Sequence, residues 1–230
     1  LRPFYCMPIQ GVRLTRPDQL LTPHEIEQVV TAAVSLGFRR VRITGGEPTL
    51  RPDLLEIVYR LAEIDGLQDL AMTTNGILLP RLANGLRKAG LRRVNIHLDS
   101  LHPGRLQRIM RFGTVEEIWA GLTPIKLNVV VARGYNDMDV VDLARLTLER
   151  AWHVRFIELM PLGGGEEARI ALHHFLSNLE VQRRIEEALG PLQLLPKLHP
   201  ADESVNYQLP GARGVVGFIS PVSQPYCGSC

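Results

Sequence analysis

The chain has 230 residues, of which 45% are hydrophobic and 22% charged, and its formal net charge is +2. This composition is ordinary for a globular protein and leaves room for one large domain or two small ones. The nearly balanced charge argues against a nucleic-acid-binding protein or a polybasic membrane protein, and no apolar run approaches the roughly 20 residues of a membrane span.

The first predicted element is a helix that starts with a capping box. Thr22 stands at the N-cap, Pro23 at the first helical position and Glu25 at the third, and Gly37 ends the helix. Apolar residues at helical spacing predict one apolar face on it: Ile26, Val29, Val30, Ala33 and Val34. The segment RRVRITGG follows and alternates as a strand does.

The strand–helix rhythm then repeats along the chain. Further helices are expected over 53–62, 79–89 and 139–151, and further strands over 69–74, 93–98, 125–131 and 154–160. Thr114 and Glu117 form a second capping box before IWAGL. After the glycine-rich break PLGGGEE, we expect a helix over 179–189 and a hairpin of the strands VNYQL and GVVGFIS. Residues 1–162 and 163–230 are therefore interpreted as two regions.

Repeated strand–helix units predict parallel strands with right-handed crossovers, in a barrel or an open sheet. Polar motifs gather at the carboxyl ends of successive strands, namely TGGEP, TTNG, LDS, LNVV and ELMP. Such a rim is the active-site face of a barrel. No G-x-G-x-x-G follows a strand, which argues against a Rossmann fold. We predict an α/β fold of the partial TIM-barrel type with a smaller C-terminal extension.

Two kinds of motif could carry chemistry. The stretch GGEP is either a tight turn or a place where backbone approaches a ligand, with Glu47 accepting from an ammonium or hydroxyl group. Cys6 is the sole cysteine of the first 200 residues, and Cys227 and Cys230 form a C-x-x-C pair. An odd number of cysteines is a poor disulfide framework and favours a reducing, cytoplasmic setting. The thiols then suit a buried hydrophobic role, a zinc site, a redox motif or an iron–sulfur cluster.

The order of the motifs resembles a known family. YCMP, TGGEP, TTNG, LDS, KLN, RFIELMP and GFISPVSQPYCGSC follow one another as in the radical S-adenosylmethionine (SAM) superfamily. The series is most similar to the molybdenum cofactor biosynthesis A family, the GTP 3′,8-cyclases. GFISPVS followed by C-x-x-C is the most family-specific part, whereas TGGEP indicates only the superfamily.

The resemblance implies a lyase with SAM and two [4Fe–4S] clusters as cofactors. One cluster, on a CxxxCxxC loop, cleaves SAM with an electron from a donor, and the 5′-deoxyadenosyl radical takes the 3′ hydrogen of GTP. The ribose then joins C8 of guanine, which the second cluster holds. The product is passed on toward cyclic pyranopterin monophosphate synthase, in the first step of molybdenum cofactor biosynthesis. A homodimer is compatible with the sequence.

The resemblance also implies roles for individual residues. The SAM contacts would be Tyr5, Gly46, His97 and Met160. The GTP contacts would be Arg42, Thr73 and Lys126. The cluster ligands would be Cys6 for the first cluster and Cys227 and Cys230 for the second.

Strand alternation supports an anionic substrate independently. Arg40, Arg42 and Thr44 share one face of their strand, and Lys126 and Asn128 share one face of theirs. A charge-assisted bond to a triphosphate would offset the desolvation of such a cation by about 1.5–3 kcal/mol. The alternative for Lys126 is a solvated strand end.

The sequence departs from the family pattern at several points. The first cysteine of CxxxCxxC would precede Leu1, the second falls on Pro3, and the third ligand of the second cluster would follow Cys230. His97 replaces the usual serine, so that the contact to SAM is an imidazole contact, a backbone contact or none. The helix in WAGL also runs into TPIKLN with almost no connection.

Two explanations of these departures compete. One is that the protein is a cluster-less nucleotide-binding relative. The other is that the sequence lacks residues at cofactor loops that are mobile without the metal, and this is the explanation that we expect. A different radical SAM enzyme with an auxiliary cluster, such as a peptide maturase, and a plain zinc protein remain further alternatives.

Overall fold

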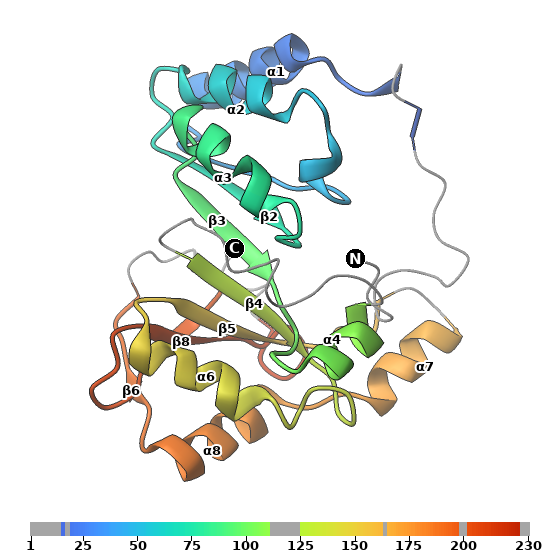
Figure 1. Cartoon of the computed structure of the whole chain (residues 1–230), viewed down its shortest axis with the longest axis vertical. Coiled ribbons are helices and arrows are strands. Elements are labelled where there is room, and N and C mark those ends of the chain that lie inside the picture. Colours follow the sequence, from blue (N-terminus) through green and yellow to red (C-terminus); the bar gives the residue numbers. More distant parts are fainter. Residues whose placement is uncertain (1–14, 17–18, 111–124, 163–164, 198–201, 226–230) are drawn as a thin grey trace. The chain divides into compact units, whose positions relative to one another are not determined.

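The computed structural model describes residues 15–16, 19–110, 125–162, 165–197 and 202–225 (Figure 1). These residues divide into two compact units. Residues 15–97 form nearly all of the first unit, and residues 98–110 and 126–225 form the second. The second predicted capping box and the short WAGL connection lie outside the described residues.

The first unit contains three parallel strands in the order β1-β2-β3. They are β1 (Arg40–Ile43), β2 (Asp69–Thr74) and β3 (Arg93–His97). The helices are α1 (Pro23–Ser35), α2 (Leu54–Ala62) and α3 (Leu79–Lys88), with a short 3-10 turn, η2 (Pro48–Leu50). Figure 1 shows α1 and α2 side by side. Each strand and helix lies where the periodicity of the sequence predicts it, within two or three residues.

The capping box of α1 is confirmed. The Thr22 hydroxyl accepts from the Glu25 backbone N–H, and the Glu25 carboxylate accepts from the Thr22 backbone N–H at 2.7 Å. The predicted apolar face of this helix is only partly right. Val34 is buried, but Val29 is 60% exposed, because the contact with α2 covers a narrower stripe than the sequence pattern.

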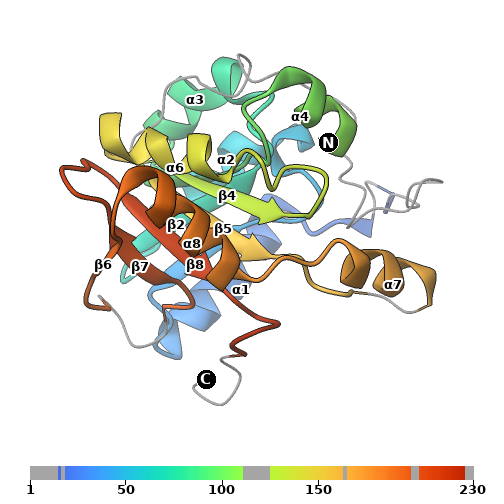
Figure 2. The ribbon, with the colours of Figure 1, turned by 90° about the horizontal axis from the view of Figure 1, so that it is seen from below.

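The second unit contains five strands in the order β4-β5-β8-β7-β6. The parallel strands are β4 (Ile125–Val131), β5 (His153–Glu158) and β8 (Val215–Ile219), and the antiparallel ones are β7 (Val205–Gln208) and β6 (Gln193–Leu194). The helices are α4 (Pro103–Met110), α6 (Val140–Glu149), α7 (Glu166–His173) and α8 (Asn178–Leu189). Figure 2 shows α6 and α8 next to each other along β5 and β8.

Strand alternation separates an apolar face from a polar one in both units. In the second unit the apolar face includes Phe156 of β5 and Phe218 of β8, whose rings stack with centroids 5.9 Å apart. In the first unit it includes Met72 of β2 and Ile96 of β3, both at most 2% exposed. The core therefore lies on the apolar face of the strands, as the α/β prediction requires.

Several features differ from the sequence prediction. The sequence does not predict helices α4 and α7, the turn η2 or the short strand β6. Helix α7 begins directly after a glycine-rich stretch that reads as a break, with Gly165 at its N-cap. Strand β5 ends at Glu158 rather than at Met160. The predicted hairpin exists, but β8 also pairs in parallel with β5, so that it belongs to the main sheet of its unit. Short-range patterns do not reveal such a pairing, because its partner is about sixty residues away in the chain.

Candidate substrate and cofactor site

The polar face of the first unit carries the predicted GTP-binding residues of that unit. Arg42 is the register partner of Ala71, and Thr73 stands two residues further along β2, so both lie on one face. Arg42 is exposed, and the described residues give it no ion-pair partner. An unpaired cation on the polar face of the strand fits a site for an anionic ligand.

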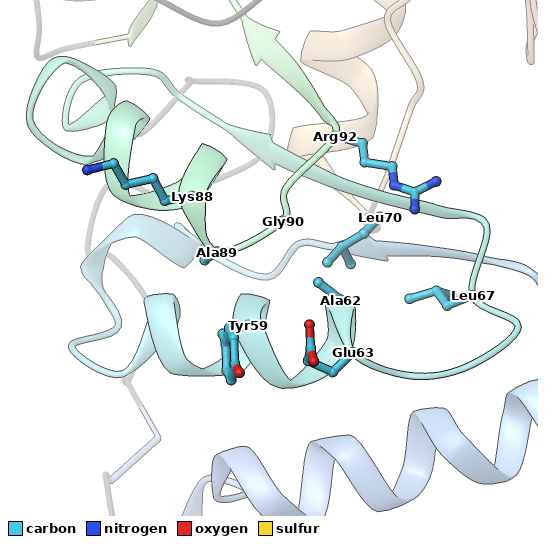
Figure 3. A pocket seen from close by; sticks show the side chains of 9 residues that line it. All are labelled: Tyr59, Ala62, Glu63, Leu67, Leu70, Lys88, Ala89, Gly90 and Arg92. Carbon is cyan, nitrogen blue, oxygen red and sulfur yellow. The ribbon is translucent and has the colours of Figure 1, made fainter.

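The hollow in Figure 3 lies on the opposite face of β2. Leu70 lines it together with Tyr59 and Ala62 of α2, and Leu70 alternates with Thr73 along the strand. Its volume is about 220 Å³. This is below the roughly 300–1,000 Å³ of ordinary ligand pockets. The hollow is therefore separate from the predicted nucleotide site.

The carboxylate of the GGEP motif is occupied by groups of the chain itself. Glu47 Oε1 accepts from the Thr49 backbone N–H at 3.0 Å and from the Thr74 hydroxyl at 2.7 Å, and Oε2 accepts from the Asn75 backbone N–H at 2.8 Å. The sequence predicts that Glu47 accepts from a ligand's ammonium or hydroxyl group, whereas the hydroxyl that it accepts from in the structure belongs to Thr74. Glu47 thus connects the loop after β1 to the loop after β2, at the carboxyl ends of the two strands.

Gly46, the residue before Glu47, is not required by the backbone geometry of the fold. A Cβ built on Gly46 would meet no atom within 4 Å, and its φ is not positive, in contrast to Gly45 at φ +141°. The backbone geometry therefore requires glycine at position 45 but not at position 46. Exposed, unobstructed backbone at Gly46 fits close approach by a ligand such as SAM.

The other two predicted SAM contacts occupy the carboxyl ends of strands. His97 is the last residue of β3 and is half-buried. Met160 follows β5, is 37% exposed, and its carbonyl accepts from the Leu162 N–H at 2.8 Å. The LDS stretch after His97 serves the fold, because buried Asp99 accepts from the Val130 N–H at 2.9 Å.

The polar face of the second unit holds more cationic groups than the sequence predicted. Lys126 of β4 is half-buried rather than a solvated strand end, and its register partner on β5 is His153. Arg155, two residues along, is only 8% exposed and donates from Nε to Asn128 Oδ1 at 2.9 Å. Sequence reasoning missed Arg155, although its position in the alternating strand VRFIELM marks it as an inward arginine.

His153 is neutral in this environment. Burial, and then the positive charges of Arg155 and Lys126, lower the pKa of His153 to about 3. The side chain of Asn206 acts in the opposite direction and raises the pKa of His153, but the causes that lower it outweigh this effect. The face thus keeps two permanent cations beside an uncharged imidazole.

Glu158 at the end of β5 fixes the loop that leads to the C-x-x-C pair. Its carboxylate is 1% exposed and accepts from the backbone N–H groups of Asn178 at 2.9 Å, Val222 at 3.1 Å and Ser223 at 2.8 Å. The Ser223 hydroxyl donates to it as well. Because Asn178 is the first residue of α8, the negative charge also favours that helix. The carboxylate therefore joins α8, β5 and the segment SPVS.

Four predicted site residues lie outside the described residues: Tyr5, Cys6, Cys227 and Cys230. Within the part of the chain that the structure describes, no group of three or more His, Cys, Asp or Glu side chains could hold a metal ion. The described helices also include none long and apolar enough to cross a membrane.

Two family models match the chain. The Radical SAM superfamily model matches residues 4–147, and the Molybdenum Cofactor Synthesis C model matches residues 152–230. Proteins named GTP 3′,8-cyclase from Alkaliphilus oremlandii and Moorella thermoacetica are 44% and 42% identical over 238 residues, covering 100% of this chain and 72% of each relative. The chain belongs to the GTP 3′,8-cyclase family of radical SAM proteins.

The fold agrees with this family membership. The crystal structure of Streptococcus suis SuiB bound to S-adenosylmethionine is similar with a TM-score of 0.52 at 16% identity, over 67% of this chain and 37% of that one. The predicted radical SAM type of α/β fold is thereby confirmed. Members of this superfamily use SAM and an iron–sulfur cluster, so the family membership also supports both cofactors.

The role of Glu158 can be tested with Glu158→Gln. The amide would present N–H donors to backbone N–H groups that need an acceptor, and we expect the free energy of unfolding to fall by about 1.5–3 kcal/mol. Urea unfolding measures this, and proteolysis within 220–225 should become faster. Glu187→Gln, at an exposed helical position, should change stability by less than about 0.5 kcal/mol. Equal stability of the two variants would contradict the assignment.

The low pKa of His153 predicts a pH dependence of stability. The unfolded chain binds a proton near pH 6.5 and the folded chain near pH 3, so stability falls as the pH drops below 6.5. Between pH 7 and pH 5 the loss from this group is about 2 kcal/mol. We expect His153→Gln to remove that part of the loss in urea unfolding, whereas exposed His24→Gln should retain it. An unchanged pH profile in His153→Gln would refute the assignment.

Proposed function

We propose that the chain is a GTP 3′,8-cyclase, which joins the ribose of GTP to C8 of guanine after removal of the 3′ hydrogen. The observation that carries this proposal is the likeness of the whole chain to proteins named GTP 3′,8-cyclase, at 44% identity. The reaction is the first step of molybdenum cofactor biosynthesis. The match of residues 152–230 to the Molybdenum Cofactor Synthesis C model supports that assignment over other radical SAM activities.

In this proposal the polar strand faces bind GTP. Arg42 and Lys126 pair with the triphosphate, and the Thr73 hydroxyl bonds the nucleotide. The support is that Arg42 is exposed without an ion-pair partner among the described residues, and that Lys126 is half-buried on an inward face. We add Arg155 as a third cation, since it is 8% exposed and lies on the same face as Lys126. Its Nε is held by Asn128, and the fixed guanidinium suits a phosphate.

SAM is proposed to contact Tyr5, Gly46, His97 and Met160. When bound, SAM and its cluster supply the radical that takes the 3′ hydrogen of GTP. The open backbone at Gly46 and the position of His97 and Met160 at strand ends support their assignment. Glu47 contributes indirectly, because it holds the two loops on either side of that backbone.

Cysteine thiolates are the donors that iron–sulfur clusters require. Cys6 is proposed as a ligand of the SAM-binding cluster, and Cys227 and Cys230 as ligands of a second [4Fe–4S] cluster that holds guanine. The segment 220–223 that precedes Cys227 is anchored through Glu158. Position 3, where the family motif has its second cysteine, is Pro3, which cannot ligate iron.

Further proposals concern the setting of the enzyme. The reaction needs an electron donor, and its product is passed on toward cyclic pyranopterin monophosphate synthase. We place the protein in the cytoplasm, where thiolate clusters remain reduced, and propose a homodimer as its assembly.

The function is tested with GTP deuterated at C3′. The protein is reconstituted with iron and sulfide without oxygen, and is given SAM and dithionite. We expect 5′-deoxyadenosine that carries the deuterium, together with a cyclised product of unchanged elemental composition. Deoxyadenosine without deuterium would contradict abstraction at C3′.

A cluster-less nucleotide-binding relative is the second candidate, and Pro3 is the observation that favours it. It predicts GTP binding with no cleavage of SAM, and no absorbance from iron–sulfur charge transfer after reconstitution. A peptide maturase predicts SAM cleavage that does not depend on GTP.

The role of Arg42 predicts a loss of GTP affinity in Arg42→Gln. A charge-assisted hydrogen bond is worth about 1.5–3 kcal/mol, so we expect affinity to fall by roughly 10- to 150-fold in equilibrium dialysis. Arg81→Gln, which removes the same charge from an exposed position on α3, should bind GTP as the wild type does. Equal GTP affinity in Arg42→Gln would remove this residue from the site.

A further inference from the structure

Asn95 is a buried polar residue whose side chain has no partner among the residues that the structure describes. It is 0% exposed, and neither its Oδ1 nor its Nδ2 has a hydrogen-bond partner among them. Buried polar groups are nearly always paired, and an unmet group costs about 1–3 kcal/mol. Such a group is explained where a ligand, an ion or a water supplies the missing partners.

The same chain satisfies a comparable buried asparagine completely. Asn136 is also 0% exposed, and its Oδ1 accepts from the Ala132 N–H at 2.8 Å. Its Nδ2 donates to the carbonyls of Asp99 at 2.8 Å and Val130 at 2.9 Å. Asn136 fixes the loop after β4 through these bonds, whereas the Asn95 side chain makes no such bond to a described residue. The contrast indicates that Asn95 serves something other than the fold.

The register of the sheet places Asn95 on the polar face of the first unit. Its partner across β2 is Thr73, and the neighbouring level of the same face consists of Arg42, Ala71 and Arg93. Two residues of a strand rise by about 6.6 Å. Thr73 and Asn95 are therefore displaced from Arg42 by about that rise toward the carboxyl ends of the strands, and they lie one and two strands across the sheet, at about 4.8 Å per strand.

The chemistry of a carboxamide selects among the parts of a nucleotide. A phosphate only accepts hydrogen bonds and would leave Oδ1 unpaired, whereas a hydroxyl group both donates and accepts. In a nucleoside triphosphate the ribose hydroxyls are the next polar groups after the phosphates. Given the proposed function, on which this inference rests, we propose that the Asn95 carboxamide binds a ribose hydroxyl of GTP, with the phosphates at the level of Arg42.

The first experiment measures the affinity of the wild type for GTP, 2′-deoxy-GTP and 3′-deoxy-GTP by equilibrium dialysis, without SAM turnover. We expect at least one deoxynucleotide to bind about tenfold more weakly than GTP, because without its ribose hydroxyl the Asn95 carboxamide stays unpaired in the complex. Equal affinity for all three would overturn the inference. Absence of GTP binding by the wild type would instead overturn the proposed function.

The second experiment uses Asn95→Leu, which keeps the side-chain size and removes both polar atoms, and Asn95→Val as a second variant suited to a strand. Since an unpaired buried amide is lost, unfolding by urea should show unchanged or greater stability. GTP affinity should fall about tenfold, and the discrimination against the deoxynucleotide should disappear. The control Asn84→Leu, at an exposed position of α3, should leave both properties unchanged.

Two results would overturn the inference. One is unchanged GTP affinity in a folded Asn95 variant. The other is weaker GTP binding that retains full discrimination against the deoxynucleotides but loses discrimination against inosine triphosphate. The latter would assign the carboxamide to the guanine base.

Discussion

Carboxylates that accept backbone N–H groups hold the ends of the strands together with the loops that follow them. Glu158 joins the end of β5 to the start of α8 and to the loop 220–223. Glu47 does the same between the loops after β1 and β2. Each carboxylate meets several donors at once, and these donors stabilise the charge of Glu158 although it is removed from water.

At each strand end, one residue is bonded within the fold while a residue close to it in the sequence stays exposed. In GGEP, Gly46 presents open backbone while Glu47 is engaged by the fold. In ELMP, Glu158 is engaged while Met160 remains 37% exposed. A rigid partner next to an exposed group is the arrangement that precise ligand positioning requires. Family motifs of this kind therefore mix residues that hold loops with residues that are proposed to touch ligands.

The strand faces show a second division, between groups that are satisfied by the protein and groups that are not. Asp69 pairs with Arg93, and Arg155 is held by Asn128. Arg42 and Asn95 on the same kind of face have no such partners in the described residues. An unmatched charge and an unmatched amide on neighbouring levels are consistent with a polyanion joined to a hydroxyl-bearing group. A nucleoside triphosphate has that chemistry.

The sequence by itself determined the elements, the α/β class and the family, because these rest on local patterns: the alternation in RRVRITGG, the capping box at Thr22, and the order of short motifs. It also placed Arg42, Thr73 and Lys126 on the polar faces of their strands, since alternation along a strand is local. Only the tertiary structure decided that Glu47 is bound by Thr74, that β8 pairs with β5, and that Asn95 has no partner among the described residues. Hydrogen bonds such as that from Ser223 to Glu158 join residues 65 positions apart. Whether a buried polar group finds a partner at that distance depends on sheet register, which no local pattern contains.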